Sequence, residues 1–262
     1  MPGGFFVGAG AALAPDGDPV FPPALMVRFT LFGIPVEIQP WFWLTAALLS
    51  GALNEATPGK MQEALIFILA ATISILVHEF GHALTGRRLG GGQAKIVLWA
   101  FGGLAYNQGG RFTKSGHFWR IAAGPGAGFL LGGLVFLVMV AGFGARDAGG
   151  LAAGSLFGIG VPVSADTFAF FENRRPLLSL LDSMLWINFW WGIINLLPVS
   201  PLDGGQITEL FVKPQKRVHQ IAIVAAVAMV AFGLWRGSLY TALLFGYLAW
   251  KNYQSMKEYH WQ

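Results

Sequence analysis

The sequence predicts an all-α polytopic membrane protein with about six transmembrane helices and short β-strand elements, including a hairpin, at the membrane surface. Of its 262 residues, 55% are apolar and only 11% are charged, against roughly 25% charged residues in an average soluble domain. Apolar runs of helical length recur along the chain. This composition excludes a disordered chain and an ordinary water-soluble enzyme, and a net charge of only +4 argues against a nucleic-acid partner.

The N-terminal part of the chain predicts a leader followed by a hairpin. Residues 1–24 are rich in Gly, Ala and Pro, and no Lys or Arg precedes their apolar patch, which makes a poor signal peptide. We expect a flexible leader there and a single transmembrane core over residues 25–262. Residues 26–40 alternate β-favouring residues around Gly33, which predicts a short hairpin lying at the membrane surface.

Six apolar runs follow and are expected to supply the transmembrane helices. A full span needs about 20 residues, so only the second, third and fourth runs qualify by themselves, and four or five spans stay open as an alternative. A further apolar stretch, residues 151–171, is interrupted by glycines and Pro162 and is expected to be an external loop that dips into the interface. The six runs are residues 41–53, 64–77 with a helical continuation to 85, 118–143, 177–197, 221–234 and 239–250.

The basic residues predict the orientation of the chain. With six spans, five of the 17 Lys and Arg residues fall in the loops of one side and the other twelve fall on the opposite side. Because cytoplasmic loops carry the excess of basic residues, we expect the side with twelve to be cytoplasmic, together with both termini. The chain is therefore predicted to be a multi-pass protein of the cell (inner) membrane. The five residues of the external side are Lys60, Arg146, Arg174, Arg175 and Arg236.

The segment SILVHEFGHALTG, in the second apolar run, carries the residues best suited to chemistry. His78 and His82 are four residues apart, so on a helix they project from one face and both imidazoles can reach one metal ion. Glu79 lies beside the first histidine, where its carboxylate can act on metal-held water without being a ligand. Two histidines and a glutamate are costly in an apolar membrane segment, which favours a metal site over a helix end with two ordinary histidines. The absence of Cys excludes a thiolate site.

A catalytic zinc site has three protein ligands, so the histidine pair leaves one to be found. The remaining histidines and the acids near the same membrane face are the candidates. Asp203, in the segment NLLPVSPLDGG, is the best of them, because it follows the fourth apolar run on the face where the pair is expected and Pro198 and Pro201 break the helix there. An ordinary turn is the alternative for this segment. The other histidines, each expected to be solvated, are His117, His219 and His260.

The order HEFGH and then NLLPVSPLDGG, in two apolar segments, resembles the site-2 protease family of intramembrane zinc metalloproteases. The stretches FTLFGIPVEIQPWFW, LWAFGGLAY and AAGPGAGF are similar to the compact microbial members of that family. The resemblance covers about residues 26–210, and the two motifs on one membrane face are its most specific part.

The resemblance implies a site with one Zn²⁺ per chain and Glu79 as the catalytic base. It also places Asn188 and Asn195 near the substrate path, as candidate oxyanion donors. The implied zinc ligands are His78, His82 and Asp203.

Two residues depart from the family pattern. Ser200 stands where a second proline is usual, and Gly128 stands where asparagine often follows the A-G-P element, so one polar contact in the third span is expected to be missing. No stretch between Gly86 and Phe118 is long enough for a PDZ insert, and none after Trp250 for a regulatory domain such as a CBS domain. We therefore expect a bare catalytic core.

The family resemblance implies hydrolysis of peptide bonds within or near transmembrane segments of membrane-protein substrates. Glu79 is expected to take a proton from zinc-held water and to deliver it later to the leaving amine. A substrate helix must unwind first, and we hypothesise that an edge within residues 93–104 pairs with the unwound segment as an added strand. Because zinc is expected near the side of Arg87 and Lys95, cleavage is predicted nearer the cytoplasm.

Two other functions stay open from the residues alone. A metal transporter or storage protein needs several acidic or histidine residues along a continuous path, whereas this chain offers one tight cluster. A proteolytically inactive relative, acting as a scaffold or inhibitor, is disfavoured because all the ligand and base positions are present. The substrate and the oligomeric state have no signature in the sequence.

Overall fold

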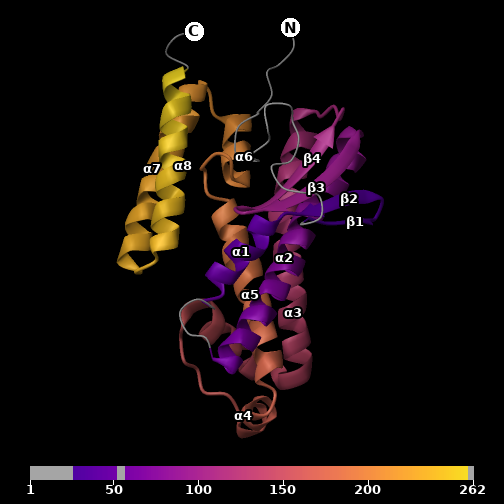
Figure 1. The fold of residues 1–262 in the computed structure, drawn as a ribbon, viewed down its shortest axis with the longest axis vertical. Helices are drawn as coiled ribbons and strands as arrows, with labels where there is room; N and C mark the ends of the chain where they lie inside the picture. The colour runs from indigo at the N-terminus through magenta and orange to yellow at the C-terminus, as the bar shows by residue number, and fades with distance from the viewer. Residues whose placement is uncertain (1–25, 52–56, 259–262) are drawn as a thin grey trace.

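The computed structural model describes residues 26–51 and 57–258, which form a mainly helical molecule with one small sheet (Figure 1). The predicted leader, residues 1–24, lies outside the described residues. The strands are β1 (Val27–Leu31), β2 (Ile34–Ile38), β3 (Gln93–Trp99) and β4 (Gly102–Gln108). The helices are α1 (Pro40–Leu49), α2 (Pro58–Gly90), α3 (Lys114–Phe157), α4 (Ala165–Glu172), α5 (Arg175–Asn195), α6 (Asp203–Phe211), α7 (Gln215–Trp235) and α8 (Leu239–Glu258).

Four of these helices, α2, α3, α5 and α7, are long and apolar enough to cross a membrane. The expectation of six transmembrane helices is therefore not confirmed. Helix α1 has 10 residues, which is about 15 Å of helix against a hydrocarbon core of roughly 30 Å. Helix α8 has 20 residues, but its last two turns are polar and contain Lys251, Asn252 and Lys257.

The sheet joins strands that are far apart in the sequence, in the order β1-β2-β3-β4. Strands β1 and β2 form an antiparallel hairpin around Phe32 and Gly33, which have φ values of 53° and 69°, as tight two-residue hairpin loops require. This confirms the hairpin predicted at residues 26–40. Strand β3 runs parallel to β2 and antiparallel to β4, so one sheet contains the strands that precede α1 and those that follow α2.

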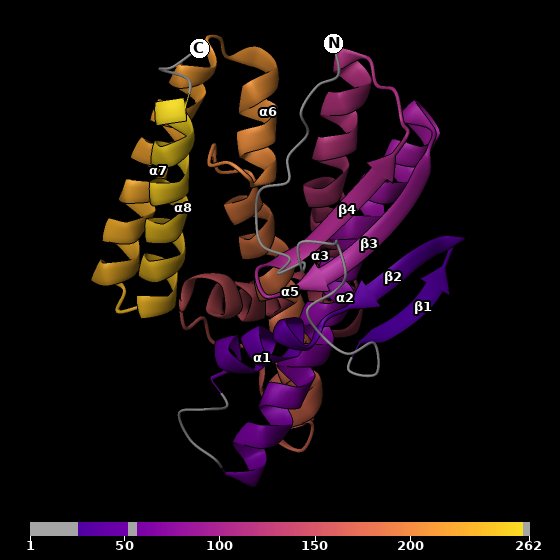
Figure 2. The ribbon, with the colours of Figure 1, turned by 45° about the horizontal axis from the view of Figure 1, so that its top comes forward.

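The buried face of the sheet packs on α2 (Figure 2). Ile34, Ile96 and Leu98 are fully buried in a cluster that includes Phe80 and Ala83 of α2. Burial of this apolar surface stabilises the contact between sheet and helix. It also fixes the rotation of α2 about its axis, and with it the direction in which the histidine face of the helix points.

Helix α3 is interrupted at Gly144, whose φ of 80° and ψ of 159° are not helical. The chain then continues as helix to Phe157, and α4 begins at Ala165. The predicted external loop at residues 151–171 is therefore wrong at both of its ends, where the chain is helical. Each glycine in this helix costs about 1 kcal/mol relative to alanine, and packing of this part of α3 against Leu185 of α5 offsets that cost.

Helices α7 and α8 form a hairpin that stands at one side of the molecule, beside α6 (Figure 1). An apolar cluster joins this hairpin to the loop between α5 and α6 through Val199, which is fully buried. The partners of Val199 in the cluster are Ala226 of α7 and Phe245 and Leu248 of α8. The hairpin is therefore anchored on the loop that leads to Asp203.

Candidate active site

Helix α2 carries three of the predicted site residues in its buried part. His78, Glu79 and His82 are 3%, 4% and 7% exposed. The two imidazole rings meet edge to face with their centroids 4.8 Å apart, and their Nε2 atoms are 3.1 Å apart. A spacing of four residues on one helix thus brings both Nε2 atoms to the same place.

Asp203, the first residue of α6, reaches the same place from the other half of the chain. Its Oδ2 lies 3.1 Å from Nε2 of His78, and its Oδ1 lies 3.3 Å from Nε2 of His82. Burial of this carboxyl opposes its ionisation, but the adjacent His82 and His78 outweigh burial and hold the pKa of Asp203 below its ordinary value. The structure therefore brings a carboxylate into contact with both histidines.

Two glycines after Asp203 allow α6 to begin directly against the end of α5. A Cβ atom on Gly204 would lie 2.0 Å from the carbonyl oxygen of Leu196, and one on Gly205 would lie 2.5 Å from the backbone nitrogen of Ser200. No side chain fits at these distances. The glycines are thus needed for close packing of the backbone that presents Asp203.

This set of donors fits a metal ion. The separations of 3.1–3.3 Å between the imidazole nitrogens and carboxylate oxygens are close to the edge of a tetrahedron with bonds of roughly 2.0–2.1 Å, about 3.3–3.4 Å. Three protein ligands with a fourth position left open is the arrangement of a catalytic zinc site. His78, His82 and Asp203 could therefore hold a metal ion, with Glu79 within 4.8 Å of the histidine donors.

Helix α3 orients the second histidine. Nδ1 of His82 lies 2.9 Å from the carbonyl oxygen of Arg120, which only accepts, so Nδ1–H donates and Nε2 is left with its lone pair. Gly124 provides the space for the ring, because a Cβ atom there would lie 2.1 Å from Nε2 of His82. Neither contact has a sequence signal of its own, since one uses a backbone carbonyl and the other a missing side chain.

Glu79 is held by strand β4. A Cβ atom on Gly103 would lie 2.3 Å from Cγ and 2.5 Å from Oε1 of Glu79, and the backbone of Ala105 is a hydrogen-bond partner of the carboxylate. In the glycine pair of LWAFGGLAY, the second residue, Gly103, is thus needed to leave space for the side chain of Glu79. The sheet places the Glu79 carboxylate beside the histidine pair.

Asn188 and Asn195 are both buried on α5. Nδ2 of Asn188 donates to Oγ of Ser74 at 2.9 Å and to a carbonyl of its own helix at 2.8 Å, whereas its buried Oδ1 has no partner among the described residues. A Cβ atom on Gly128 would lie 3.6 Å from this Oδ1. The unpartnered oxygen of Asn188 therefore lies next to Gly128, the position at which the family often has asparagine and at which we expect a polar contact to be missing.

The other histidines lie outside the cluster. His117 contacts the guanidinium of Arg120 at 3.0 Å. The expectation that His219 is solvated is wrong: it is 6% exposed, and its Nδ1 lies 3.1 Å from Oδ1 of Asn252, because α8 covers it. His260 lies beyond the part of the chain that the structure describes.

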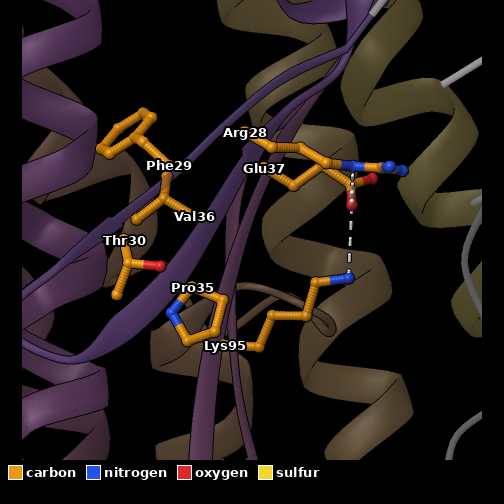
Figure 3. Close-up of a pocket in the computed structure, with 7 residues that line it drawn as sticks. All are labelled: Arg28, Phe29, Thr30, Pro35, Val36, Glu37 and Lys95. Carbon is orange, nitrogen blue, oxygen red and sulfur yellow. Dashed lines mark hydrogen bonds and ion pairs between the residues drawn. The ribbon is translucent and has the colours of Figure 1, made fainter. Parts of the chain in front are cut away.

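A pocket on the sheet lies apart from this cluster (Figure 3). In it, Oε2 of Glu37 is shared between Nε of Arg28 at 3.3 Å and Nζ of Lys95 at 3.4 Å. None of the predicted site residues lines the pocket. The chemistry of the candidate site therefore lies in the buried cluster between α2, α3, α6 and the sheet.

Comparison with known proteins agrees with these motifs. Zinc metalloprotease MJ0392 of Methanocaldococcus jannaschii is 28% identical over 213 residues, covering 79% of this chain and 53% of that protein. A putative zinc metalloprotease of Mycobacterium tuberculosis is 25% identical over 233 residues, covering 82% of this chain and 51% of that protein. The chain thus spans about half the length of the curated relatives that it matches.

The fold has a counterpart among solved structures. The site-2 protease from Methanocaldococcus jannaschii superposes with a TM-score of 0.51 at 24% identity, covering 87% of this chain and 94% of that chain; this similarity supports the fold. Residues 66–233, which include both sequence motifs, match Peptidase family M50. The chain therefore belongs to peptidase family M50, the site-2 protease family that its motifs resemble.

Proposed function

We propose that this chain is an intramembrane zinc metalloprotease that hydrolyses peptide bonds within or near transmembrane segments of membrane-protein substrates. The observation that carries the proposal is the buried convergence of two imidazoles and a carboxylate beside the carboxyl group of Glu79, in a molecule with four apolar helices of spanning length. The names of the relatives, which are zinc metalloproteases, support zinc as the metal.

The roles that we propose for the site residues follow from the chemistry of their side chains. His78, His82 and Asp203 would hold one zinc ion, which when bound polarises a peptide carbonyl and makes water a better nucleophile near neutral pH. Glu79 accepts the proton of the attacking water and delivers it to the leaving amine. The contacts of Glu79 with Gly103 and Ala105 support this role, because they fix its carboxylate beside the histidine pair.

The developing oxyanion needs a hydrogen-bond donor, and Asn188 and Asn195 are our candidates. Both N–H groups of Asn188 already donate, to Ser74 and to α5. Nδ2 of Asn195 donates to the carbonyl oxygen of Trp191 at 3.0 Å, its single acceptor within the described ranges. The second N–H of Asn195 has no acceptor among the described residues, so it is available to donate to the oxyanion. This supports Asn195 as the better candidate of the two.

We further propose that the unwound substrate adds to the sheet as a strand. Strand β3 pairs with β4 along its length and with β2 only along residues 96–98. Two edges within residues 93–104 therefore stay open, residues 93–95 of β3 and the part of the range that belongs to β4, and we favour β4. Strand β4 is at the edge of the sheet, and its backbone at Ala105 faces Glu79. A strand added there would bring its carbonyl groups next to the catalytic base.

We propose a multi-pass topology in the cell (inner) membrane, with both termini and the zinc site toward the cytoplasm. Helix α2 covers about 50 Å in one direction, yet β2 before α1 and β3 after α2 lie in one sheet. We therefore propose that the segment that contains α1 makes the return crossing, and that α8 makes another beside α7. This supports six crossings, with the sheet on the side of Arg87 and Lys95 and cleavage nearer the cytoplasm.

The experiment that tests this function uses the purified chain in proteoliposomes with a single-span reporter protein. We expect wild type to cut the reporter nearer its cytoplasmic end, as read by mass spectrometry of the products. Glu79→Gln should keep the zinc content of wild type and reduce cleavage at least about 100-fold, because it removes the general base.

Normal cleavage by Glu79→Gln would show that another residue is the base, and products cut near the external end would refute the proposed depth. The transporter alternative makes a different prediction. If the chain is a metal transporter, wild type should move metal across the proteoliposome membrane, and the Glu79→Gln variant should move it at the same rate. Zinc binding without cleavage of any single-span reporter by wild type would favour an inactive scaffold.

A further inference from the structure

One buried side chain ties the loop before Asp203 to the C-terminal helix. Asn252 of α8 is 2% exposed. Its Nδ2 donates to the carbonyl oxygen of Ser200 at 2.8 Å, across 52 positions of sequence, and to the carbonyl oxygen of Leu248 in its own helix at 2.9 Å. Ser200 stands three residues before Asp203. The contact therefore acts on the backbone that leads directly into the candidate metal ligand.

His219 of α7 orients this amide. Its Nδ1 lies 3.1 Å from Oδ1 of Asn252, and because that oxygen only accepts, the imidazole N–H donates. Both hydrogens and the oxygen of the Asn252 side chain are thus engaged. Rotation of the amide by half a turn would place its NH₂ group against the imidazole donor and its oxygen against two carbonyls, so one orientation is selected.

Apolar packing holds the same loop, and the hydrogen bond adds a directional contact to it. Val199, next to Ser200, is fully buried against Ala226, Phe245 and Leu248. This cluster brings the loop and the helical hairpin together through the hydrophobic effect, which is non-directional. The hydrogen bond from Asn252 to the Ser200 carbonyl supplies a direction.

We propose that Asn252, held by His219, is a positioning residue that orients the loop at residues 198–203 so that the carboxylate of Asp203 meets His78 and His82. This inference rests on the proposed function, because it takes Asp203 as a zinc ligand. Asn252 lies beyond residues 66–233, the part of the chain that matches the family. The family match therefore does not account for it.

The test uses the full chain, purified in detergent, stripped of metal and titrated with Zn²⁺ or Co²⁺. Asn252→Leu keeps the branched shape and the number of side-chain heavy atoms and removes both donors. We expect it to weaken zinc binding about tenfold, which is at the lower end of what loss of an outer-shell partner of a metal site costs, and to change the visible spectrum of the Co²⁺-loaded protein. His219→Leu should act in the same direction, and His219→Asn, which retains an N–H donor, should restore wild-type zinc affinity.

Ser238→Ala is the matched control for general loosening of the helical hairpin. Oγ of Ser238 accepts from the backbone of Thr241 at the opposite end of α7 and α8, so its loss should lower the thermal midpoint without changing zinc affinity. If Asn252→Leu lowers the midpoint as Ser238→Ala does but keeps the wild-type affinity and Co²⁺ spectrum, Asn252 is only structural and the proposal is overturned. If Asn252→Leu does not fold, His219→Leu is judged by the same criterion.

Asp203→Ala separates this inference from the proposed function. Loss of zinc binding in Asp203→Ala with wild-type binding in Asn252→Leu would refute the positioning role alone. Wild-type zinc binding in Asp203→Ala would refute the assignment of Asp203 as a ligand, and with it the proposed site.

Discussion

The candidate site depends on missing side chains as much as on the residues that carry chemistry. His82 and Gly124 are on different helices, and the imidazole of His82 occupies the space that a Cβ atom at Gly124 would need. In the same way, the side chain of Glu79 on α2 occupies the space that a Cβ atom at Gly103 of β4 would need. Interiors are close-packed, so an added methyl group displaces what it meets. These glycines therefore decide where the reactive groups lie.

Gly124→Ala is expected to displace the ring of His82 and weaken zinc binding by about 5- to 150-fold, since an added methyl in a filled site costs about 1–3 kcal/mol. Gly126→Ala, two residues along α3, is the matched control, because no atom outside the neighbouring backbone of α3 lies within 4 Å of the Cβ position there. Titration of both metal-free proteins with zinc gives the comparison. Equal affinities for the two variants would contradict the packing argument.

At the scale of elements, buried polar contacts hold the helices where apolar packing alone leaves freedom. Asp147, just after the interruption of α3, accepts hydrogen bonds from the backbone and hydroxyl of Ser164 and, at 2.6 Å, from the hydroxyl of Thr167. Ser164 is the N-cap of α4, where a negative charge also interacts favourably with the helix dipole. The second half of α3 and α4 are thereby joined at the end of the molecule opposite His82.

Thr167→Val should lower the thermal stability of the protein, because it removes a hydrogen bond to a charged acceptor, which is stronger than one between neutral groups. The control is Thr72→Val, which loses only a bond from a hydroxyl to the carbonyl of Ile68 within α2. Thermal unfolding in detergent compares the two. We expect Thr167→Val to have the lower midpoint and to keep wild-type zinc content, and equal midpoints would refute the role of Asp147 as a joint.

For the whole molecule, the mixed sheet limits how the chain threads the bilayer. In its parallel pair, the end of β2 and the start of β3 lie at opposite ends of the two strands, so residues 39–92 must connect them by a crossover. A parallel pair always needs such a crossover, and here α1 and α2 supply it. The position of the sheet and the distribution of basic residues therefore support the same orientation.

Labelling of single cysteines tests this topology, and the absence of Cys from the chain makes the result unambiguous. Cysteine placed at Glu172, an exposed residue of α4, should react with a membrane-impermeant maleimide in intact cells. Cysteine at Gln108, an exposed residue of β4, should react only after the cells are opened. The reverse pattern would invert the proposed orientation and place the zinc site toward the outside.

Features encoded locally were predictable from the residues. The spacing of His78 and His82 specifies one helix face, and the hairpin around Gly33 follows from alternation and turn preference. Pro198 and Pro201 indicate that the helix of the fourth apolar run ends before Asp203. The failures are equally specific. The loop predicted at residues 151–171 is wrong at its ends because the prediction relied on the glycine content of the segment, whereas packing against other helices stabilises helix there. His219 was expected to be solvated because the helix that covers it is distant in the sequence.

The sequence alone determined the residue types of the site, their order and the lipid environment, because each depends on composition or on spacing within one element. Only the tertiary structure decided that Asp203 meets the histidine pair, that the Arg120 carbonyl orients His82, that β4 holds Glu79 and that Asn252 binds the loop before Asp203. All of these contacts join segments that are distant in the sequence, and all except that of Asp203 use a backbone atom or a vacant Cβ position. Such groups are shared by nearly all residues, so no sequence pattern marks them.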